Sequence, residues 1–462
     1  MNTLTDFIND DNITTENQKE SSSVSREYKI SEVASNEWKS FAMYTVESRA
    51  IPNMIDGLKP VQRFYLYSSL LNSKRDFKKV SAVAGIISDY GYNHGEASAA
   101  GSGQLMAAVW NNNVCLVEGR GSFGTRLVQE AGAPRYVYTR VHENFNKYIK
   151  DLDLSPIHED PEHEPPAFYL PVIPLVLSNG TKGIATGFAT NILPRDTNSL
   201  SSACREFLMY GNISKKLPVK FPEFTGAVEY NEEENRYYCN GLYEKKSKTV
   251  LEITEVPYGF DRESYIKVLD DLEEKGDIVS YDDLCDKSGF KFEVKLKQNS
   301  SANWNDVKII KQFKLSKPFV ENLTVIDYDG KLREYEDERK LIADFCKYRL
   351  TVLQKRIDLR KKEYSELMRW LLVKMQFIQA VLDNKIEFKN KKKADVAEQI
   401  IDHTGALNDE DIDRLLRINI LSLTDEMVKQ LQNEIDQAAK DYKHWSSTTS
   451  DKQFLEDLAE LS

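Results

Sequence analysis

The sequence has few cysteines, no long apolar run and almost no glycine or proline in its last third. Its five cysteines are dispersed and no two form a Cys-x-x-Cys pair, so neither a zinc knuckle nor a disulfide framework is expected. A scattered, odd set of thiols suits a reducing cytoplasm. The longest apolar stretch, residues 166–177, contains three prolines and is too short to span a bilayer. These absences predict a cytoplasmic protein with no membrane partner.

Most motifs for nucleotides and catalytic metals are missing too. The chain has no Gly-x-x-x-x-Gly-Lys-Ser/Thr loop and no plausible Asp-x-Asp set on strands, with an upstream glutamate, for two magnesium ions. Residues 119–124, Gly-Arg-Gly-Ser-Phe-Gly, match the pattern Gly-x-Gly-x-x-Gly. A dinucleotide site needs a helix directly after the glycines, but Gly132 and Pro134 follow within ten residues. A nucleotide-dependent kinase or oxidoreductase built on this loop remains one alternative.

The charge distribution matters more than its sum. The 462 residues suffice for about three domains of roughly 150 residues each, and the formal net charge of −11 at first argues against a nucleic-acid partner. Between residues 37 and 80, however, basic residues outnumber acidic ones, so a polyanion is expected to contact this part of the chain. The basic residues there are Lys39, Arg49, Lys59, Arg63, Lys74, Arg75, Lys78 and Lys79.

Apolar periodicity predicts several short helices in the first third. The polar residues 1–29 lack such periodicity and are predicted to be a disordered leader. Helical spacing follows over residues 31–47, 61–71, 80–90 and 96–110, the second directly after Pro60, which suits the first turn of a helix. Short helices joined by tight turns could form a helix-turn-helix layer, although many all-α domains look alike.

The middle of the chain changes to a β-type pattern. Residues 172–190 and 248–259 are β-branched runs interrupted by glycine and proline, which predict strands and hairpins. A mixed α+β domain is therefore expected over residues 156–330.

The last third predicts long helices. No proline follows Pro318 and Gly405 is the one glycine after Gly330. Apolar residues keep a three-and-four spacing from Lys340 to Leu382, which predicts one helix about 65 Å long at 1.5 Å per residue. A second helix near residues 425–445 could return antiparallel to it. We expect an extended coiled-coil arm, with an ordinary helical hairpin as the alternative.

One pair of neighbouring residues has the chemistry of phosphodiester cleavage. A phenolate, as at Tyr136, can attack phosphorus, and the guanidinium of Arg135 could stabilise both the phenolate and the charged transition state. Spacing alone does not select Tyr136, because the chain has 23 tyrosines and a buried structural tyrosine is the usual case.

A family resemblance does select it. Five segments, in this order and spacing, together resemble the DNA breakage-reunion component of type IIA DNA topoisomerases, the family that includes the A subunit of gyrase. The segments are SRAIPNMIDGLKPVQR (48–63), YGYNHGEASAAGSGQLMAAVW (90–110), EGRGSFGTR (118–126), APRYVYTR (133–140) and YLPVIPLVLSNGTKGIATGFATNILP (169–194). The sequences GTRLVQ, PRY and VIPLVL are nearer to the eukaryotic and T-even-like phage members than to gyrase.

The resemblance implies an α+β multidomain fold and a homodimeric DNA gate. The implied parts are a winged-helix DNA-cleavage domain (30–155), a tower domain (156–330), coiled-coil arms (331–385 and 425–462) and an exit-gate dimerisation globule (386–424). The enzyme would break both strands of one duplex, pass another through and reseal the break. A partner with TOPRIM acidic residues and an ATPase would hold the Mg²⁺ and ATP, with no metal site in this chain. The alternative is a non-catalytic DNA-bending scaffold of the same fold.

The resemblance also implies site residues. Tyr136 would form a 5′-phosphotyrosyl link, exchanging one phosphoester for another, and Arg135 would stabilise the transition state. Phosphate contacts position a duplex without reading its sequence, and Ile173 would enter a base step and bend the DNA. The other expected DNA-binding residues are Arg49, Lys59, Arg63, Asn93 and His94. Asn93 replaces a histidine that many relatives carry.

Overall fold

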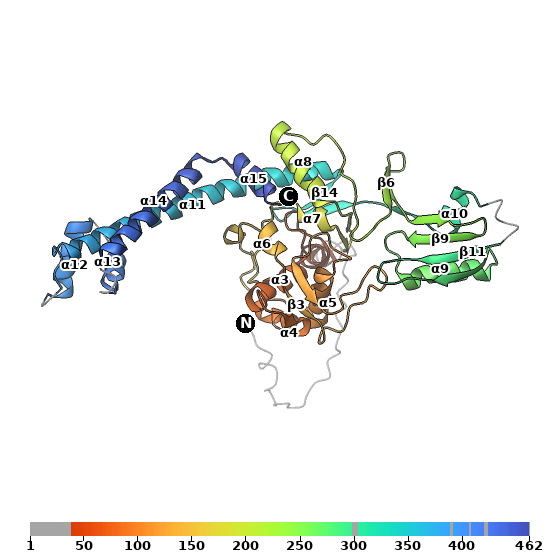
Figure 1. Ribbon diagram of the computed structural model, residues 1–462, viewed down its shortest axis with the longest axis horizontal. Coiled ribbons are helices and arrows are strands. Elements are labelled where there is room, and N and C mark those ends of the chain that lie inside the picture. The colour runs from red at the N-terminus through yellow and green to blue at the C-terminus, as the bar shows by residue number, and fades with distance from the viewer. Residues whose placement is uncertain (1–37, 298–303, 389–390, 406–407, 420–423, 462) are drawn as a thin grey trace, which may run out of the picture.

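The structure has a central body, a helical arm on one side and a β-rich unit on the other (Figure 1). It is a computed structural model that describes residues 38–297, 304–388, 391–405, 408–419 and 424–461. The leader predicted at residues 1–29 lies outside the described residues. Within the described residues, no helix combines the length and the apolar composition needed to cross a bilayer.

The first part of the body is a helical layer on a small sheet. Its helices are α2 (Lys39–Thr45), continued by the π-helical η3 (Val46–Ala50), then α3 (Pro60–Asn72), α4 (Val80–Gly85), the 3-10 turn η4 (Ile87–Tyr90) and α5 (Glu96–Ala107). Pro60 is the first residue of α3, as predicted. The strands β1 (Lys78–Lys79), β3 (Tyr138–Val141) and β2 (Val117–Arg120) form an antiparallel sheet in that order.

A close approach ties these helices together. A Cβ atom at Gly103 of α5 would lie 2.2 Å from the ring of Tyr65 in α3, so only glycine fits there. The Tyr65 hydroxyl lies 2.6 Å from the Thr139 hydroxyl in β3, and burial raises the pKa of Tyr65 to about 12. Helix α3 is thus fixed to both α5 and β3.

The predicted strand over residues 172–190 is only partly correct. Its second half forms the hairpin of β4 (Thr181–Ile184) and β5 (Ala189–Ile192), whereas the first half ends in a short helix, α7 (Leu175–Asn179). Pro174 lacks the N–H that a central strand requires, and its carbonyl instead accepts hydrogen bonds from Leu177 and Ser178. The remaining helical elements of this region are α6 (Asn144–Tyr148), η5 (Leu152–Leu154) and α8 (Thr197–Tyr210).

The β-rich side contains the expected strands. A four-stranded antiparallel sheet has the order β10 (Ile278–Asp283), β11 (Phe292–Leu296), β9 (Val250–Glu255) and β8 (Leu242–Lys245). With helices α9 (Arg262–Glu274) and α10 (Asp306–Gln312) it encloses its own apolar core, and we call residues 242–315 the four-stranded unit. Nearer the body lie the sheet of β12 (Ser316–Phe319), β7 (Arg236–Asn240) and β6 (Ala227–Asn231) and the pair β13 (Leu323–Ile326) and β14 (Leu332–Tyr335).

The arm confirms the predicted long helix. Helix α11 (Glu338–Leu382) is continuous over 45 residues, and α14 (Asp425–Ser447) runs beside it (Figure 1). Between them, far from the body, lie α12 (Lys393–Thr404) and α13 (Asp409–Leu416). The chain returns to the body in α15 (Ser450–Ala459).

A buried network of four charged residues joins the arm to the body. Arg349 and Arg356 of α11 face Asp457 of α15 and Asp151 of the body, at nitrogen–oxygen distances of 2.5–3.0 Å. All four side chains are buried. Burial by itself raises the pKa of Asp151, but hydrogen bonding and the charges of Arg356 and Arg349 outweigh this and lower it. Two guanidinium groups thus face two carboxylates in the interior, and removing one carboxylate leaves a buried positive charge without its counter-charge.

We expect Asp457→Asn to lower the free energy of unfolding by about 3–5 kcal/mol, the usual cost of breaking a buried ion pair. The exposed carboxylate of Glu460, which pairs with Lys150 in the same region, provides the control. Glu460→Gln should cost about 1 kcal/mol or less. Urea denaturation followed by circular dichroism measures both, and equal losses in the two variants would contradict a special role for the network.

Candidate functional site

Tyr136 is exposed at a tight turn just before β3. The Tyr136 N–H donates to the Ala133 carbonyl at 2.9 Å and closes the turn. The next residue, Val137, is buried, whereas the Tyr136 side chain is 68% exposed, unlike the usual structural tyrosine. The Arg135 guanidinium carbon lies 5.0 Å from the centre of the Tyr136 ring. The predicted pair is thus presented to solvent as a phenol beside a cation.

Exposed cations surround this turn. Strand β3 lies between β1 and β2, which places Tyr138 opposite both Lys79 and Arg120. The Arg120 guanidinium lies 5.7 Å from the Tyr138 ring centre. A cluster of like charges on one edge attracts a polyanion. The exposed basic residues here are Lys74, Arg75, Lys78, Lys79, Arg120 and Arg135.

A second cluster brings Arg49 and His94 together. Arg49 Nη2 lies 3.2 Å from His94 Nδ1, and the Tyr44 hydroxyl lies 3.0 Å from His94 Nε2. Because a guanidinium can only donate, His94 Nδ1 accepts and the imidazole is neutral. Burial and the Arg49 charge both lower the pKa of His94. Asn93 is exposed beside it. The sequence analysis did not single out Tyr44, because nothing in the pattern places α2 against residue 94.

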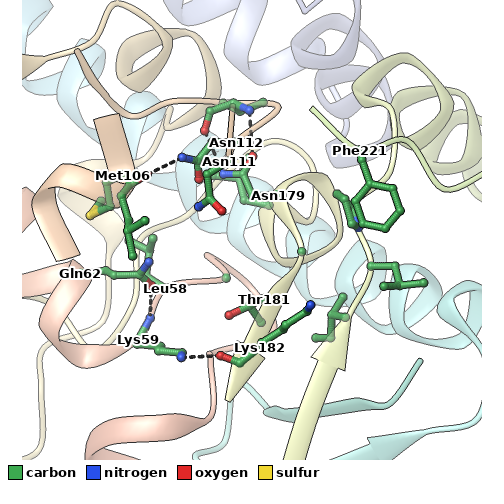
Figure 2. A pocket seen from close by; sticks show the side chains of 18 of the residues that line it. Leu58, Lys59, Gln62, Met106, Asn111, Asn112, Asn179, Thr181, Lys182 and Phe221 are labelled. Carbon is green, nitrogen blue, oxygen red and sulfur yellow. Dashed lines mark hydrogen bonds between the residues drawn. The ribbon is translucent and has the colours of Figure 1, made fainter. Parts of the chain in front are cut away.

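Lys59 lies apart, in a cleft of about 410 Å³ (Figure 2). Its ammonium group donates to the Lys182 carbonyl at 2.6 Å, and burial lowers the pKa of Lys59. Gln62 accepts from the Lys59 backbone N–H at 2.8 Å. The rest of its lining is mostly apolar, with a few amide side chains, among them Asn111, Asn112 and Asn179. The structure therefore does not bring Lys59 into the cluster of Arg49 and His94.

The expectation that Arg63 holds the DNA backbone is wrong in this structure. Arg63 is 7% exposed, and its Nε and Nη2 donate to the Asp56 carboxylate at 3.0 and 3.1 Å. Asp56 also accepts from the backbone N–H groups of Leu58 and Tyr169. A buried carboxylate needs a counter-charge, and Arg63 supplies it.

The expectation for Ile173 is also wrong. Ile173 is fully buried in the main core and cannot reach a ligand on the surface. The exposed isoleucine of the same sequence segment is Ile184, at the end of β4, with 89% of its surface exposed. Its position in the run Lys-Gly-Ile-Ala-Thr-Gly was a usable signal, since small and polar neighbours in a hairpin offer nothing to pack against.

No group of three or more His, Cys, Asp or Glu residues able to hold a metal ion occurs among the described residues. The groups that the two clusters present are an exposed phenol, a partly exposed imidazole and several cations. This set can bind an anion and attack it with an oxygen nucleophile.

Comparisons with known proteins identify the class. A profile of the DNA gyrase/topoisomerase IV family, describing the A subunit of these enzymes, matches residues 49–460. The chain superposes on the crystal structure of the Plasmodium falciparum topoisomerase II DNA-binding, cleavage and re-ligation domain with a TM-score of 0.84 and 26% identity, over 93% of this chain and 63% of that one. The chain belongs to the family of DNA gyrase and topoisomerase IV A subunits.

Two individual relatives show which enzymes of this family the chain resembles. The chain is 41% identical to the DNA topoisomerase medium subunit of Enterobacteria phage T4, over 94% of this chain and 98% of that one. It is 28% identical to the mitochondrial DNA topoisomerase 2 of Dictyostelium discoideum, over 89% of this chain but 33% of that one. These findings confirm the predicted function class, a breakage-reunion subunit of a type II DNA topoisomerase, rather than a nucleotide-binding kinase or oxidoreductase.

We expect the His94 imidazole to titrate below its ordinary pKa of 6.5. The folded protein favours the neutral form of His94. The neutral imidazole therefore adds to the free energy of unfolding above pH 6.5, and this addition is lost as the pH falls through the lowered pKa. NMR titration of labelled histidine should show this midpoint, and Arg49→Met should raise it. Arg75→Met, which removes an exposed arginine outside the cluster, should leave it unchanged. A wild-type midpoint at or above 6.5 would contradict the structure.

Proposed function

We propose that Tyr136 is the nucleophile of a DNA gate and that Arg135 stabilises its phenolate and the transition state. The observation that carries this proposal is the Tyr136 side chain, exposed beside Arg135 at a turn with further exposed cations on the neighbouring strands. The phenolate oxygen attacks phosphorus and forms a phosphotyrosyl ester with the 5′ end, while the 3′-oxygen leaves. Because one phosphoester replaces another, the reverse attack by the 3′-hydroxyl reseals the strand.

The cations hold the duplex over this nucleophile. Arg49 and the exposed Lys and Arg side chains around β1 to β3 contact its phosphates. These contacts fix the position of the duplex without reading its base sequence. His94 and Asn93 belong to the cluster of Arg49 and contact the DNA backbone near the cleaved phosphate. The neutral His94 ring has one N–H, on Nε2, which faces the Tyr44 hydroxyl, so it donates to a phosphate only if that contact is exchanged. Lys59 reaches the duplex only if its bond to the Lys182 carbonyl is released.

Ile184 takes the role that the sequence analysis gave to Ile173. An apolar side chain that enters a base step unstacks the two base pairs and bends the duplex. Ile184 stands at the end of a two-stranded hairpin with 89% of its surface exposed, and Phe188 of the same hairpin is also exposed. The hairpin thus offers an apolar projection that nothing in the described chain covers.

The domain layout follows the family. The helices α3 to α5 with the sheet of β1 to β3 serve as the winged-helix DNA gate, and the region with the four-stranded unit serves as the tower. The pair α11 and α14 forms a coiled-coil arm, whose outer helices α12 and α13 serve as the exit gate of a homodimer. Support comes from the length of α11 and from the exposed apolar residues Leu372, Phe388 and Ile401 near the outer end.

The active enzyme contains further subunits. The phage T4 relative is called a medium subunit, and this sequence has no P-loop, so a partner with TOPRIM and ATPase activities would supply the Mg²⁺ and ATP sites. A metal ion at the phosphate supplies charge stabilisation when bound. The residues of this chain supply the nucleophile, the phosphate contacts and the apolar projection.

The test of the nucleophile is Tyr136→Phe. In the complete enzyme with magnesium and supercoiled plasmid, quenched with detergent, the wild type should leave a 5′-nucleotide adduct on Tyr136, detected by mass spectrometry. Tyr136→Phe should lose the adduct and all strand passage while it still binds DNA. Tyr210→Phe, a variant of another strongly exposed tyrosine, should keep both activities. Full strand passage by Tyr136→Phe would favour the DNA-bending scaffold instead.

The test of the apolar projection is Ile184→Ala. Energy transfer between dyes at the two ends of a short duplex reports its bend, and Ile184→Ala should reduce the bend with little loss of affinity, because phosphate contacts dominate affinity. Ile157→Ala is the matched control, since Ile157 is 91% exposed elsewhere on the body. An unchanged bend in Ile184→Ala would rule out this role.

A further inference from the structure

The loop before Tyr136 connects the body to the four-stranded unit. Residues 121–132, which we call the bridging loop, lead from β2 towards the turn of Tyr136. The Leu127 carbonyl accepts from the backbone N–H of Arg262, at the start of α9, at 3.0 Å. The Leu127 side chain packs against the core of the four-stranded unit. The middle of the loop is therefore attached to a different part of the molecule from its ends.

Arg126 attaches the loop to the four-stranded unit through its side chain. Its side chain is buried among three aromatic rings, with the guanidinium carbon 4.8 Å from the ring centre of Tyr258 and 5.5 Å from those of Phe224 and Phe290. Its Nη2 donates to Glu255 at 3.1 Å. Its Nε and Nη1 make no hydrogen bond among the described residues. The π-faces of the three rings stabilise the part of the cation that has no hydrogen-bond acceptor, while Nη2 also donates to the Val256 carbonyl at 3.3 Å.

Both oxygens of the buried Glu255 carboxylate accept hydrogen bonds, one of them from Arg126. Glu255 is 4% exposed, and its second oxygen accepts from the backbone N–H and the hydroxyl of Thr225 at 3.1 and 2.9 Å. The carboxylate is thus held by β9 and by residue 225. Glu255 and the three rings fix both the position and the direction of the Arg126 side chain.

The ends of the bridging loop hold the residue next to the nucleophile. The Gly132 N–H donates to the Ser122 carbonyl at 2.9 Å, and the Gly132 carbonyl accepts from Gln104 at 2.6 Å. A Cβ atom on Gly121 or Gly132 would lie 3.0 or 3.1 Å from a methyl group of Val137. Val137 is therefore enclosed by the two ends of the loop, and a shift of the loop would move the turn of Tyr136.

We propose that Arg126 is a positioning residue for the cleavage chemistry. By locking the middle of the bridging loop onto the four-stranded unit, it fixes the ends that enclose Val137 and so sets the orientation of Tyr136. This inference rests on the proposed role of Tyr136 as nucleophile. Arg126 acts through the loop, because its own guanidinium is enclosed in the aromatic cage.

The experiment compares Arg126→Met with the double variant Arg126→Met/Glu255→Gln in the complete enzyme with magnesium. The single change leaves a buried lone carboxylate and should lower Tm, whereas removing both charges restores a neutral interior and much of Tm. Single-turnover formation of the Tyr136–DNA adduct should fall about 10–100-fold in both variants, as expected for a misplaced reacting group, with the DNA Kd unchanged.

Two further variants sharpen the test. Arg126→Lys keeps a cation among the rings and should recover part of the rate. Lys308→Met removes a different cation–π contact of the four-stranded unit, where the ammonium lies 4.7 Å from the ring centre of Trp304, and should keep the wild-type rate. If the double variant regains both Tm and rate, Arg126 is only structural and the proposal fails. If the wild type forms no adduct, the role of Tyr136 fails and the positioning role fails with it.

Discussion

The pairing of Arg349 and Arg356 with Asp151 and Asp457 is the interaction that the arrangement of arm and body depends on. An apolar contact tolerates sliding, but two forked guanidinium groups facing two carboxylates match in few orientations. All four charges are buried. Any movement that separates them therefore leaves buried charges whose desolvation is no longer compensated by an opposite charge. The 45-residue helix α11 acts as a lever, so a small angular error at its base would displace its far end by many ångströms. A directional joint is therefore what a long arm needs.

Buried pairs of arginine and carboxylate also occur elsewhere in the body and at its contact with the four-stranded unit. They explain why counting charges in the sequence overestimated the cations available to DNA. Arg63 lies in the basic stretch of residues 37–80, yet it forms a buried ion pair with Asp56. Arg126 forms a buried ion pair with Glu255 in the same way. Arg49 lies in that stretch too but is exposed. A sequence shows how many cations a segment has, whereas their availability to a polyanion depends on which of them have a buried carboxylate to neutralise. The net charge of −11 is for that reason a poor guide to the surface around Tyr136.

The parts predicted correctly from the sequence are those set by local chemistry. Pro60 starts α3 because its fixed φ suits a first helical turn, and α11 is one helix because nothing in its sequence interrupts it. The features that could not be predicted depend on packing between residues far apart in the sequence. The burial of Ile173 and the exposure of Ile184 depend on which side of the body the chain between them covers, and both lie in the same family segment. Arg126 carried no local signal, since its three rings come from residues 224, 258 and 290, far along the chain.

The hairpin of Ile184 shows how an exposed apolar side chain is maintained at a cost. Leaving an isoleucine in water forgoes roughly 1.5–3 kcal/mol of burial free energy, so a flexible loop would fold it back onto the body. Here Gly183 lies so close to the Ala50 carbonyl that a Cβ would be 2.0 Å from it, and β4 is held by that contact with η3. Arg49, beside Ala50, bonds to His94. The proposed phosphate contact of Arg49 and the proposed apolar projection of Ile184 therefore belong to neighbouring, mutually packed segments, which would present both to a duplex at a fixed offset. In the proposed complex, stacking of Ile184 between base pairs would recover the burial that the free protein forgoes, and that recovery would offset part of the cost of bending the DNA.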